Sequence, residues 1–121
     1  MKIKNPVGLL GEDIAVDYLK KKGYKIIERN FRKKYEEIDI VALSDSTLVF
    51  VEVKTRTSNS YGSPFEGISK FKVQHLVRLA QFYKMTHKNL PEDMRIDAVG
   101  VQLTFDNKLE NIEHLENISG F

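Results

Sequence analysis

The chain has 121 residues, of which 41% are hydrophobic and 30% are charged, and its formal net charge is +2. This length suffices for one domain with its own core, which we expect over residues 1–121, and the composition is that of a globular protein. The absence of cysteine excludes disulfides, a cysteine nucleophile and a thiolate metal site. No apolar run approaches the ~20 residues of a membrane span, so we expect a cytoplasmic protein with no membrane partner.

The positive charges are concentrated towards the N-terminus. Residues 1–36 contain ten lysines and arginines against five acidic residues, whereas the last sixteen residues contain one lysine against four acids. A basic cluster of this kind can contact phosphate groups. It is equally compatible with a solvated helix end followed by an edge strand that lysines protect, and the charge distribution alone leaves both interpretations open.

The first predicted element is a helix over about residues 6–22. Asn5-Pro6 is typical of an N-cap followed by proline at the first helical position, and Gly23 can end the helix in the left-handed conformation. Apolar residues recur every three or four positions and predict the buried stripe of this helix, which consists of Val7, Leu10, Ile14 and Tyr18.

Glu12 belongs neither to this stripe nor to the solvated side of the helix. Its neighbours three and four positions away are Gly8, Leu9, Ala15 and Val16, which form a small and apolar environment for a carboxylate. The glutamate therefore either reaches solvent at the edge of the helix or points into a site, and the helix alone leaves both open.

Three strand-like segments follow the helix. The first begins at residues 24–27 and leads towards Phe31, the second covers residues 37–43 and the third covers residues 47–55. The polar stretch between the second and third segments is short enough for a tight hairpin with Asp45-Ser46 as its two-residue turn. We therefore expect these two strands to be antiparallel neighbours.

The expected hairpin brings two carboxylates together. In the register that this turn imposes, Asp39 lies across from Glu52, and Glu37 lies across from Lys54. Two carboxylates facing each other at ~5 Å repel unless a cation lies between them. Ligands that are all oxygen suit Mg²⁺ or Mn²⁺ better than zinc.

The register decides whether this interpretation holds. A slip of two residues leaves Asp39 and Glu52 on one face but diagonal, whereas a slip of one residue separates them. A simpler interpretation is that Glu52 and Lys54 mark the point where a buried strand emerges into solvent. The convergence of three ionisable residues on one face favours a site, and an ion pair between Lys54 and Glu37 is compatible with it.

The second half of the chain predicts one more helix and two more strands. Ser63-Pro64-Phe65-Glu66 fits a capping box, and a helix is expected over about residues 69–87. Strands are expected over residues 95–103 and 109–115, with a turn at Asp106-Asn107. The order α-β-β-β-α-β-β indicates one α/β domain. The apolar stripe of the second helix consists of Val73, Leu76, Val77, Ala80 and Tyr83.

The remaining aromatic and histidine side chains have no assigned role in the chemistry. Tyr61 and Phe65 follow the third strand, where they suit either stacking on a nucleic-acid base or anchoring the loop in the core, and the second role is favoured. His75, His87 and His114 show no metal-ligand spacing, so we expect them on the surface or in helices.

Several short segments spread over nearly the whole chain form one pattern. They are Gly11-Glu12, Asn30-Phe31-Arg32, Glu37-Ile38-Asp39, residues 49–56, residues 61–64 with Glu66 and Lys72, and Arg95-Ile96-Asp97. This pattern resembles the YraN-like family of small bacterial proteins, which are regarded as predicted endonucleases of the PD-(D/E)xK superfamily, similar to archaeal Holliday-junction resolvases. The resemblance implies a restriction-endonuclease-like core in α-β-β-β-α-β order, with a mixed central sheet flanked by helices. One position departs from the family, because Glu36 stands where glycine is common, and this puts in question the close turn into the second strand.

The resemblance also implies roles for single residues. Asp39 and Glu52 would ligate Mg²⁺ or Mn²⁺, and the backbone carbonyl of Val53 would add a ligand. Lys54 would be the lysine of the nuclease motif, and Glu12 would be the acidic residue that the first helix supplies.

The expected function is that of a Mg²⁺-dependent endonuclease-like enzyme that hydrolyses phosphodiester bonds in DNA, with branched or damaged DNA as candidate substrates. The second hypothesis is a nucleic-acid-binding protein of the same fold that cuts weakly or not at all, and the third is a non-catalytic interaction module. The modest net charge argues against tight, purely electrostatic binding and leaves room for a partner or a homodimer. The basic residues expected to contact the DNA backbone are Arg32, Lys33, Lys34, Arg56, Lys70 and Lys72.

Overall fold

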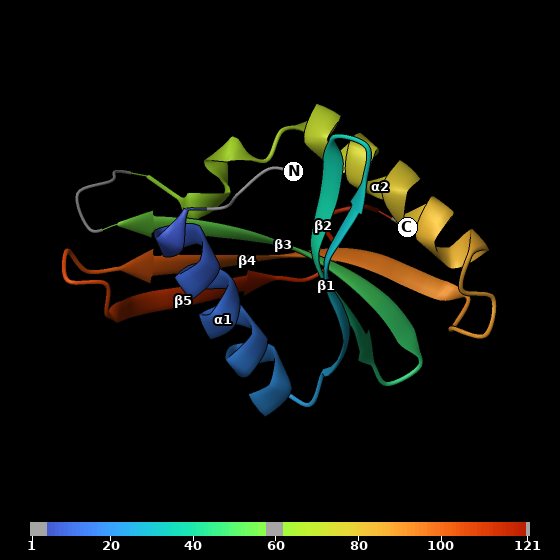
Figure 1. The fold of residues 1–121 in the computed structure, drawn as a ribbon, viewed down its shortest axis with the longest axis horizontal. Coiled ribbons are helices and arrows are strands. Elements are labelled where there is room, and N and C mark those ends of the chain that lie inside the picture. The colour runs from blue at the N-terminus through green and yellow to red at the C-terminus, as the bar shows by residue number, and fades with distance from the viewer. Residues whose placement is uncertain (1–4, 58–61, 121) are drawn as a thin grey trace.

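A five-stranded mixed sheet with a helix on each face forms the protein (Figure 1). The computed structural model describes residues 5–57 and 62–120. The expected order of helices and strands is confirmed, and a short 3₁₀ helix, η1, is added before the second helix. The elements in chain order are α1 (Pro6–Lys21), β1 (Lys25–Lys33), β2 (Glu36–Ser44), β3 (Thr47–Thr57), η1 (Pro64–Gly67), α2 (Lys70–Met85), β4 (Asp93–Leu103) and β5 (Leu109–Leu115).

The strands lie in the order β1-β2-β3-β4-β5. Neighbouring strands are antiparallel except β3 and β4, which are parallel and are connected through α2. The central strand β3 carries the most apolar run of the chain, and residues 48–51 of that run are buried. A nearly continuous apolar strand is expected where both faces of a sheet are covered.

The predicted capping residues lie at the ends of the helices, with one difference. The Asn5 side chain accepts a hydrogen bond from the Gly8 N–H, at 2.8 Å, and Gly23 has a φ of +95° after the end of α1. Ser69 caps α2, whereas the capping box of Ser63 and Glu66 belongs to η1. Within the described ranges, neither helix combines the length and the apolar character that crossing a membrane requires.

The buried stripe of α1 differs from the expected one. Its buried apolar residues are Ala15, Val16 and Leu19, whereas the predicted residues Val7, Leu10, Ile14 and Tyr18 are only partly buried at the edge of this core. The reason is a close contact at Gly11, where any side chain would collide with Thr55 on β3. The helix therefore turns the face that carries Gly11 and Glu12 towards the sheet.

The opposite face of the sheet is covered by α2. Leu76, Leu79, Ala80 and Tyr83 of this helix pack with Ile38, Val41, Phe50 and Ile96 of the sheet. On β3 the two apolar layers use alternate residues, as the period of two in a strand requires, whereas on β2 Ile38 and Ile40 pack in opposite layers, so the alternation is interrupted at Asp39. Val77 of the predicted stripe is partly buried against this layer.

The turn into β2 stays tight although residue 36 is not glycine. Lys33 pairs with Glu36 at the end of the β1–β2 ladder, so the turn consists of Lys34 and Tyr35. Lys34 takes the left-handed conformation, with a φ of 58°. A glycine at position 36 is therefore not needed for a close turn into β2, because Lys34, and not Glu36, takes the left-handed conformation.

The hairpin between β2 and β3 has the predicted register, but its ladder is shorter than expected. Ser44 pairs with Thr47 around the Asp45-Ser46 turn, and the last pair of the ladder is Ile40 with Val51. Beyond this pair β2 continues beside β1, and β3 continues beside β4, so that β2 and β3 diverge (Figure 1). The predicted cross-strand pairs of residues 39 with 52 and 37 with 54 are therefore wrong as ladder pairs.

Candidate active site

The diverging ends of β2 and β3 border a cleft that contains most of the buried charge. Among the residues that the structure describes, the buried charged ones are Glu12, Asp39, Glu52 and Asp97. The first three line one cleft of about 540 Å³, together with Lys54 and Lys72. Removing several carboxylates from water in one place is unfavourable unless positive charge or hydrogen bonds compensate.

Asp39 lies where the strands separate. Its Oδ2 accepts a hydrogen bond from the Val53 backbone N–H, at 2.8 Å. The carboxylate thus occupies the place of a backbone partner, which explains why the ladder ends before this position. Asp39 and Glu52 do line the same cleft, although they are not a ladder pair.

Glu12 points towards this carboxylate rather than into solvent. Its Oε1 accepts a hydrogen bond from Asn30 Nδ2 on β1, at 2.9 Å. Oxygen atoms of Glu12, Glu37 and Asp39 lie within 4.8 Å of one another. The sequence left open whether Glu12 reaches solvent or points into a site. In the structure it lies in the cleft, because the close contact at Gly11 holds this part of α1 against β3.

Glu37 lies in a different place from the one expected from the sequence. It was expected opposite Lys54, but it belongs to the cluster with Glu12 and Asp39, and Arg32 Nη2 donates to its Oε2 at 2.6 Å. The alternation of strand side chains, which puts Glu37 on the same face as Asp39, was the signal that could have found it.

Glu52 faces Lys72 from α2. Lys72 Nζ lies 3.3 Å from Glu52 Oε2, but the angles do not make a hydrogen bond, and this buried oxygen has no hydrogen-bond donor among the described residues. We therefore regard the contact as an ion pair that leaves the oxygen able to take another ligand.

Lys54 lines the cleft from β3, and η1 covers its side chain. η1 packs on β4 at Gly100, where any side chain would collide with Pro64. Gly100 pairs with Lys54 in the parallel ladder, and Gly67 at the end of η1 lies close to the Lys54 amine. A glycine on β4 thus lets η1 approach the sheet and limit the space open to Lys54.

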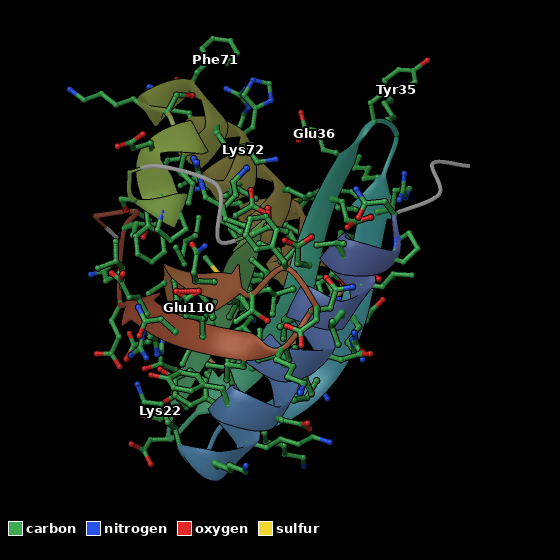
Figure 2. All side chains as sticks on the ribbon, turned by 90° about the vertical axis from the view of Figure 1, so that its left-hand side faces the viewer. Lys22, Tyr35, Glu36, Phe71, Lys72 and Glu110 are labelled. Carbon is green, nitrogen blue, oxygen red and sulfur yellow. The ribbon has the colours of Figure 1, made fainter. Side chains whose placement is uncertain are left out.

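The basic residues expected at a nucleic-acid interface belong to three parts of the fold. Arg32, Lys33 and Lys34 belong to the β1–β2 hairpin, Lys70 and Lys72 to the first turn of α2, and Arg56 to β3. Lys33 Nζ lies 3.7 Å from the centre of the Phe82 ring. Figure 2 shows Lys72 at the same end of the molecule as the hairpin tip.

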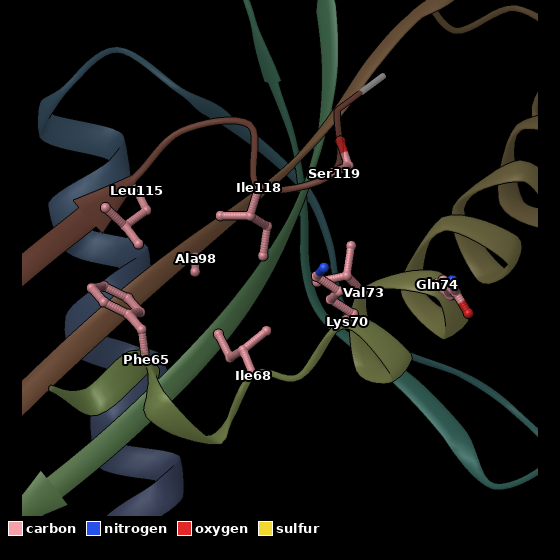
Figure 3. A pocket seen from close by; sticks show the side chains of 9 residues that line it. All are labelled: Phe65, Ile68, Lys70, Val73, Gln74, Ala98, Leu115, Ile118 and Ser119. Carbon is pink, nitrogen blue, oxygen red and sulfur yellow. The ribbon is translucent and has the colours of Figure 1, made fainter.

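A second hollow, of about 500 Å³, is apolar and holds no carboxylate (Figure 3). Phe65 and Ile68 from the η1 region and Ile118 from the C-terminal segment line it. The role of loop anchor that the sequence favoured for Phe65 agrees with this packing, while Tyr61 lies outside the described residues. Because it lacks groups that could activate water or bind a cation, this hollow is not the candidate active site.

A separate buried cluster was missed from sequence. His114 was expected on the surface or in a helix, but it lies on β5 and its side chain is buried. His114 Nε2 donates to Asp97 Oδ2 at 2.8 Å, and His114 Nδ1 accepts from Lys22 Nζ at 2.8 Å. This geometry fits a neutral imidazole with its proton on Nε2.

Asp97 accepts further hydrogen bonds that keep it charged. Arg95 Nε donates to its Oδ1 at 3.0 Å and the Asn117 N–H at 2.9 Å. Burial alone would raise the pKa of Asp97, but the hydrogen bonds from His114, Asn117 and Arg95 hold this pKa below its usual value. The carboxyl oxygens of Asp97 lie near His114 and Glu116, yet their hydrogen bonds are already made within the protein. We regard this cluster as structural.

Comparison with known proteins gives a family and several relatives. The family described as "Uncharacterised protein family UPF0102" matches residues 11–101. A UPF0102 protein of Caldanaerobacter subterraneus subsp. tengcongensis is 44% identical over 115 residues, which cover 94% of each chain. One of Syntrophomonas wolfei is 46% identical over 112 residues, covering 92% of this chain and 95% of the relative. One of Clostridium perfringens is 34% identical over 116 residues, covering 96% and 95%.

Proposed function

The chain belongs to the UPF0102 family, and we propose that it is a divalent-metal-dependent endonuclease-like enzyme that hydrolyses phosphodiester bonds in DNA. The observation that carries the proposal is the burial of Glu12, Asp39 and Glu52 in one cleft beside two lysines. Such crowding of negative charge is expected where a protein holds a cation. A mixed sheet between two helices is compatible with the restriction-endonuclease-like core that the proposal includes.

The side chains in the cleft fit Mg²⁺ or Mn²⁺. Every candidate ligand is an oxygen, which these ions prefer, and Glu52 Oε2 is buried with no hydrogen-bond donor among the described residues. Asp39, Glu52, Glu12 and the carbonyl of Val53 would hold the ion. When bound, such an ion neutralises phosphoryl charge and lowers the pKa of a water molecule.

The residues of the chain have separate tasks in this proposal. Lys54 stabilises charge that develops on the phosphoryl group or orients the attacking water. Lys72 holds Glu52 and contributes a second positive charge at the cleft. Asn30 keeps Glu12 aimed at Asp39.

The test is metal-dependent cleavage of a panel of linear, flapped and four-way-junction DNAs. We expect the purified protein to nick at least one of these DNAs with Mn²⁺ or Mg²⁺, and we expect Glu52→Gln and Lys54→Ala each to lower the rate by at least roughly a hundredfold. Glu110→Gln, at an exposed glutamate on β5, is the matched control and should cut like the wild type. Cleavage that persists in both cleft variants would assign the activity to a contaminant or another site. DNA binding without any cleavage would favour the non-cutting alternative.

The same preparations allow a test of metal binding that does not depend on activity. Mn²⁺ at ten times its dissociation constant should raise the melting temperature by about 5 °C. Asp39→Asn keeps an acceptor for the Val53 N–H but removes a charge, so it should melt higher than the wild type without metal and lose the response to Mn²⁺. An unchanged melting temperature in millimolar Mn²⁺ would contradict a metal site.

A further inference from the structure

A groove beside the proposed active cleft is lined by two exposed aromatic rings. Its volume is about 270 Å³, and its lining includes Tyr35 from the β1–β2 turn and Phe71 from the first turn of α2. Tyr35 is fully exposed and Phe71 is 69% exposed. Figure 2 shows both rings projecting from the same end of the molecule, with Glu36 and Lys72 between them. Single exposed rings are common on protein surfaces, whereas exposed apolar side chains that gather at one groove are typical of a binding site.

This groove adjoins the cleft. Lys72 lines both, and Glu37 lines the groove while its carboxylate belongs to the cluster with Glu12 and Asp39. A molecule bound in the groove would therefore lie next to the proposed reaction centre.

The groove suits a flat, uncharged ring rather than a phosphate. Glu36 and Glu37 line it and would repel a phosphate, whereas Leu76 and Leu79 give it an apolar surface. The Phe71 ring packs on the ring of His75 with a centroid distance of 4.7 Å, which widens the aromatic surface on the α2 side. Nucleic-acid bases stack on such aromatic surfaces without a requirement for sequence.

Positive charge lies on the far side of Tyr35. A neighbouring hollow of about 290 Å³ is lined by three basic residues, Lys33, Lys34 and Arg78, against one acid, Glu36, and Tyr35 lines this hollow as well as the groove. The surface thus presents a proposed reaction centre, an aromatic groove and a basic hollow in succession. This succession matches a strand that places a phosphate, a base and a further phosphate one after another.

We propose that the aromatic groove binds an unpaired base of the strand being cut, so that the substrate is DNA with unpaired nucleotides next to the scissile phosphate, as in a tail, a flap or a branch. This inference rests on the proposed function and deepens it. Bases inside a duplex are stacked on their neighbours and do not enter such a groove unless they are first unstacked. The groove therefore selects DNA that already has unpaired bases.

The test compares binding of a blunt duplex with binding of the same duplex carrying a single-stranded tail, measured by fluorescence anisotropy in Ca²⁺ at fixed salt. We expect tailed DNA to bind about tenfold more tightly, and we expect Tyr35→Ala and Phe71→Ala each to lose most of this preference while blunt-duplex affinity stays unchanged. Tyr35→Trp should keep it. The matched control is Phe105→Ala, which removes a ring that is 77% exposed, beyond the end of β4 and outside the residues that line the cleft and the groove.

The outcomes separate this inference from the proposed function. Equal affinity for the two DNAs, or an equal effect of Phe105→Ala, would overturn the groove as a base site even if the protein cuts DNA. A preference for tailed DNA that depends on Tyr35 and Phe71, in a protein that cuts nothing, would support the groove and overturn the hydrolysis. Loss of self-association in Tyr35→Ala, seen by light scattering without an effect on DNA, would make the groove a contact between copies and overturn the proposal.

Discussion

Asn30 is held in a backbone conformation that residues in strands rarely adopt. Its φ is 57°, in the left-handed region that asparagine tolerates better than most residues. Its neighbours Arg29 and Phe31 pair with Ile40 and Ile38, so Asn30 lies beside Asp39 in the sheet. From there its side chain donates to Glu12. An irregular position in β1 therefore aims a carboxylate from α1 at the cleft.

Asn30 contributes a left-handed backbone conformation and a hydrogen bond to Glu12, and we predict that two substitutions separate these contributions. Asn30→Gly keeps the backbone conformation but removes the amide, so Mn²⁺ affinity should fall by roughly tenfold, as for the loss of a group that orients a metal ligand. Asn30→Ala should also lower the free energy of unfolding by about 1–2 kcal/mol, because alanine is strained in the left-handed region. Titration calorimetry with Mn²⁺ and urea unfolding measure the two effects.

A matched control exists for this substitution. Asn107 has a φ of 63° in the turn between β4 and β5, so Asn107→Gly makes the same chemical change outside the cleft. It should leave the affinity for Mn²⁺ unchanged. If Asn30→Gly binds Mn²⁺ as tightly as the wild type does, Asn30 serves the backbone alone and does not position Glu12.

At the scale of the elements, the position of α1 on β3 depends on one missing side chain. Any Cβ at Gly11 would collide with Thr55, whereas a Cβ at Gly8 would meet, among the described residues, only Asn5 Oδ1, at 3.5 Å. Both residues lie in the same helix, and alanine is favoured over glycine in a helix by about 1 kcal/mol. The same substitution should therefore have opposite effects at the two positions.

We predict that Gly8→Ala raises the free energy of unfolding by up to about 1 kcal/mol. Gly11→Ala should lower it by roughly 1–3 kcal/mol, because overpacking outweighs the gain in helix propensity. Displacement of α1 would also move Glu12, so Gly11→Ala should weaken the response of the melting temperature to Mn²⁺. Two variants of equal stability would show that α1 does not need the close contact.

The features that the sequence predicted correctly are those that depend on residues close together in the chain. Asn5 and Gly23 bound α1, and the Asp45-Ser46 turn fixes the register of its hairpin, because caps and turns depend on neighbouring residues. The end of the β2–β3 ladder depends on the Asp39 side chain and on a helix from elsewhere in the chain, and periodicity carries no sign of it. The burial of His114 likewise follows from Asp97 on another strand. Thus Glu12, Asp39 and Glu52 were identified from sequence as candidates, whereas Glu37, although alternation puts it on the face of Asp39, was assigned to Lys54 because the ladder was expected to continue.

For the whole molecule, the cluster around Asp97 connects parts of the chain that are distant in sequence. It joins Tyr24 before β1, Arg95 on β4, His114 on β5 and the backbone of Asn117 near the C-terminus. Burial, and then the charge of Asp97, raise the pKa of Tyr24 to about 12. A buried carboxylate with this many donors stabilises the fold while it is charged, and its partners become unsatisfied when it is removed.

The pH dependence of stability follows from the direction in which folding shifts the pKa of Asp97. Because the pKa of Asp97 is lower in the folded than in the unfolded chain, its contribution is complete above the ordinary value of about 4 and is lost as the pH falls through the lower, folded value. We predict that Asp97→Asn lowers the free energy of unfolding by roughly 3 kcal/mol at pH 7. The difference from the wild type should shrink as the pH falls below about 4, in urea unfolding followed by circular dichroism.

Asp106 supplies the control for this last prediction. Its pKa is also lowered, by a hydrogen bond from Thr104, but Asp106 is exposed in the turn after β4 and connects no other strands. Asp106→Asn should therefore change stability far less than Asp97→Asn at pH 7, because solvent screens its charge. A destabilisation by Asp97→Asn that stays constant from pH 7 down to pH 2 would mean that shape, and not charge, makes position 97 important, since linkage requires the part of the difference that comes from the charge to decrease as Asp97 is protonated.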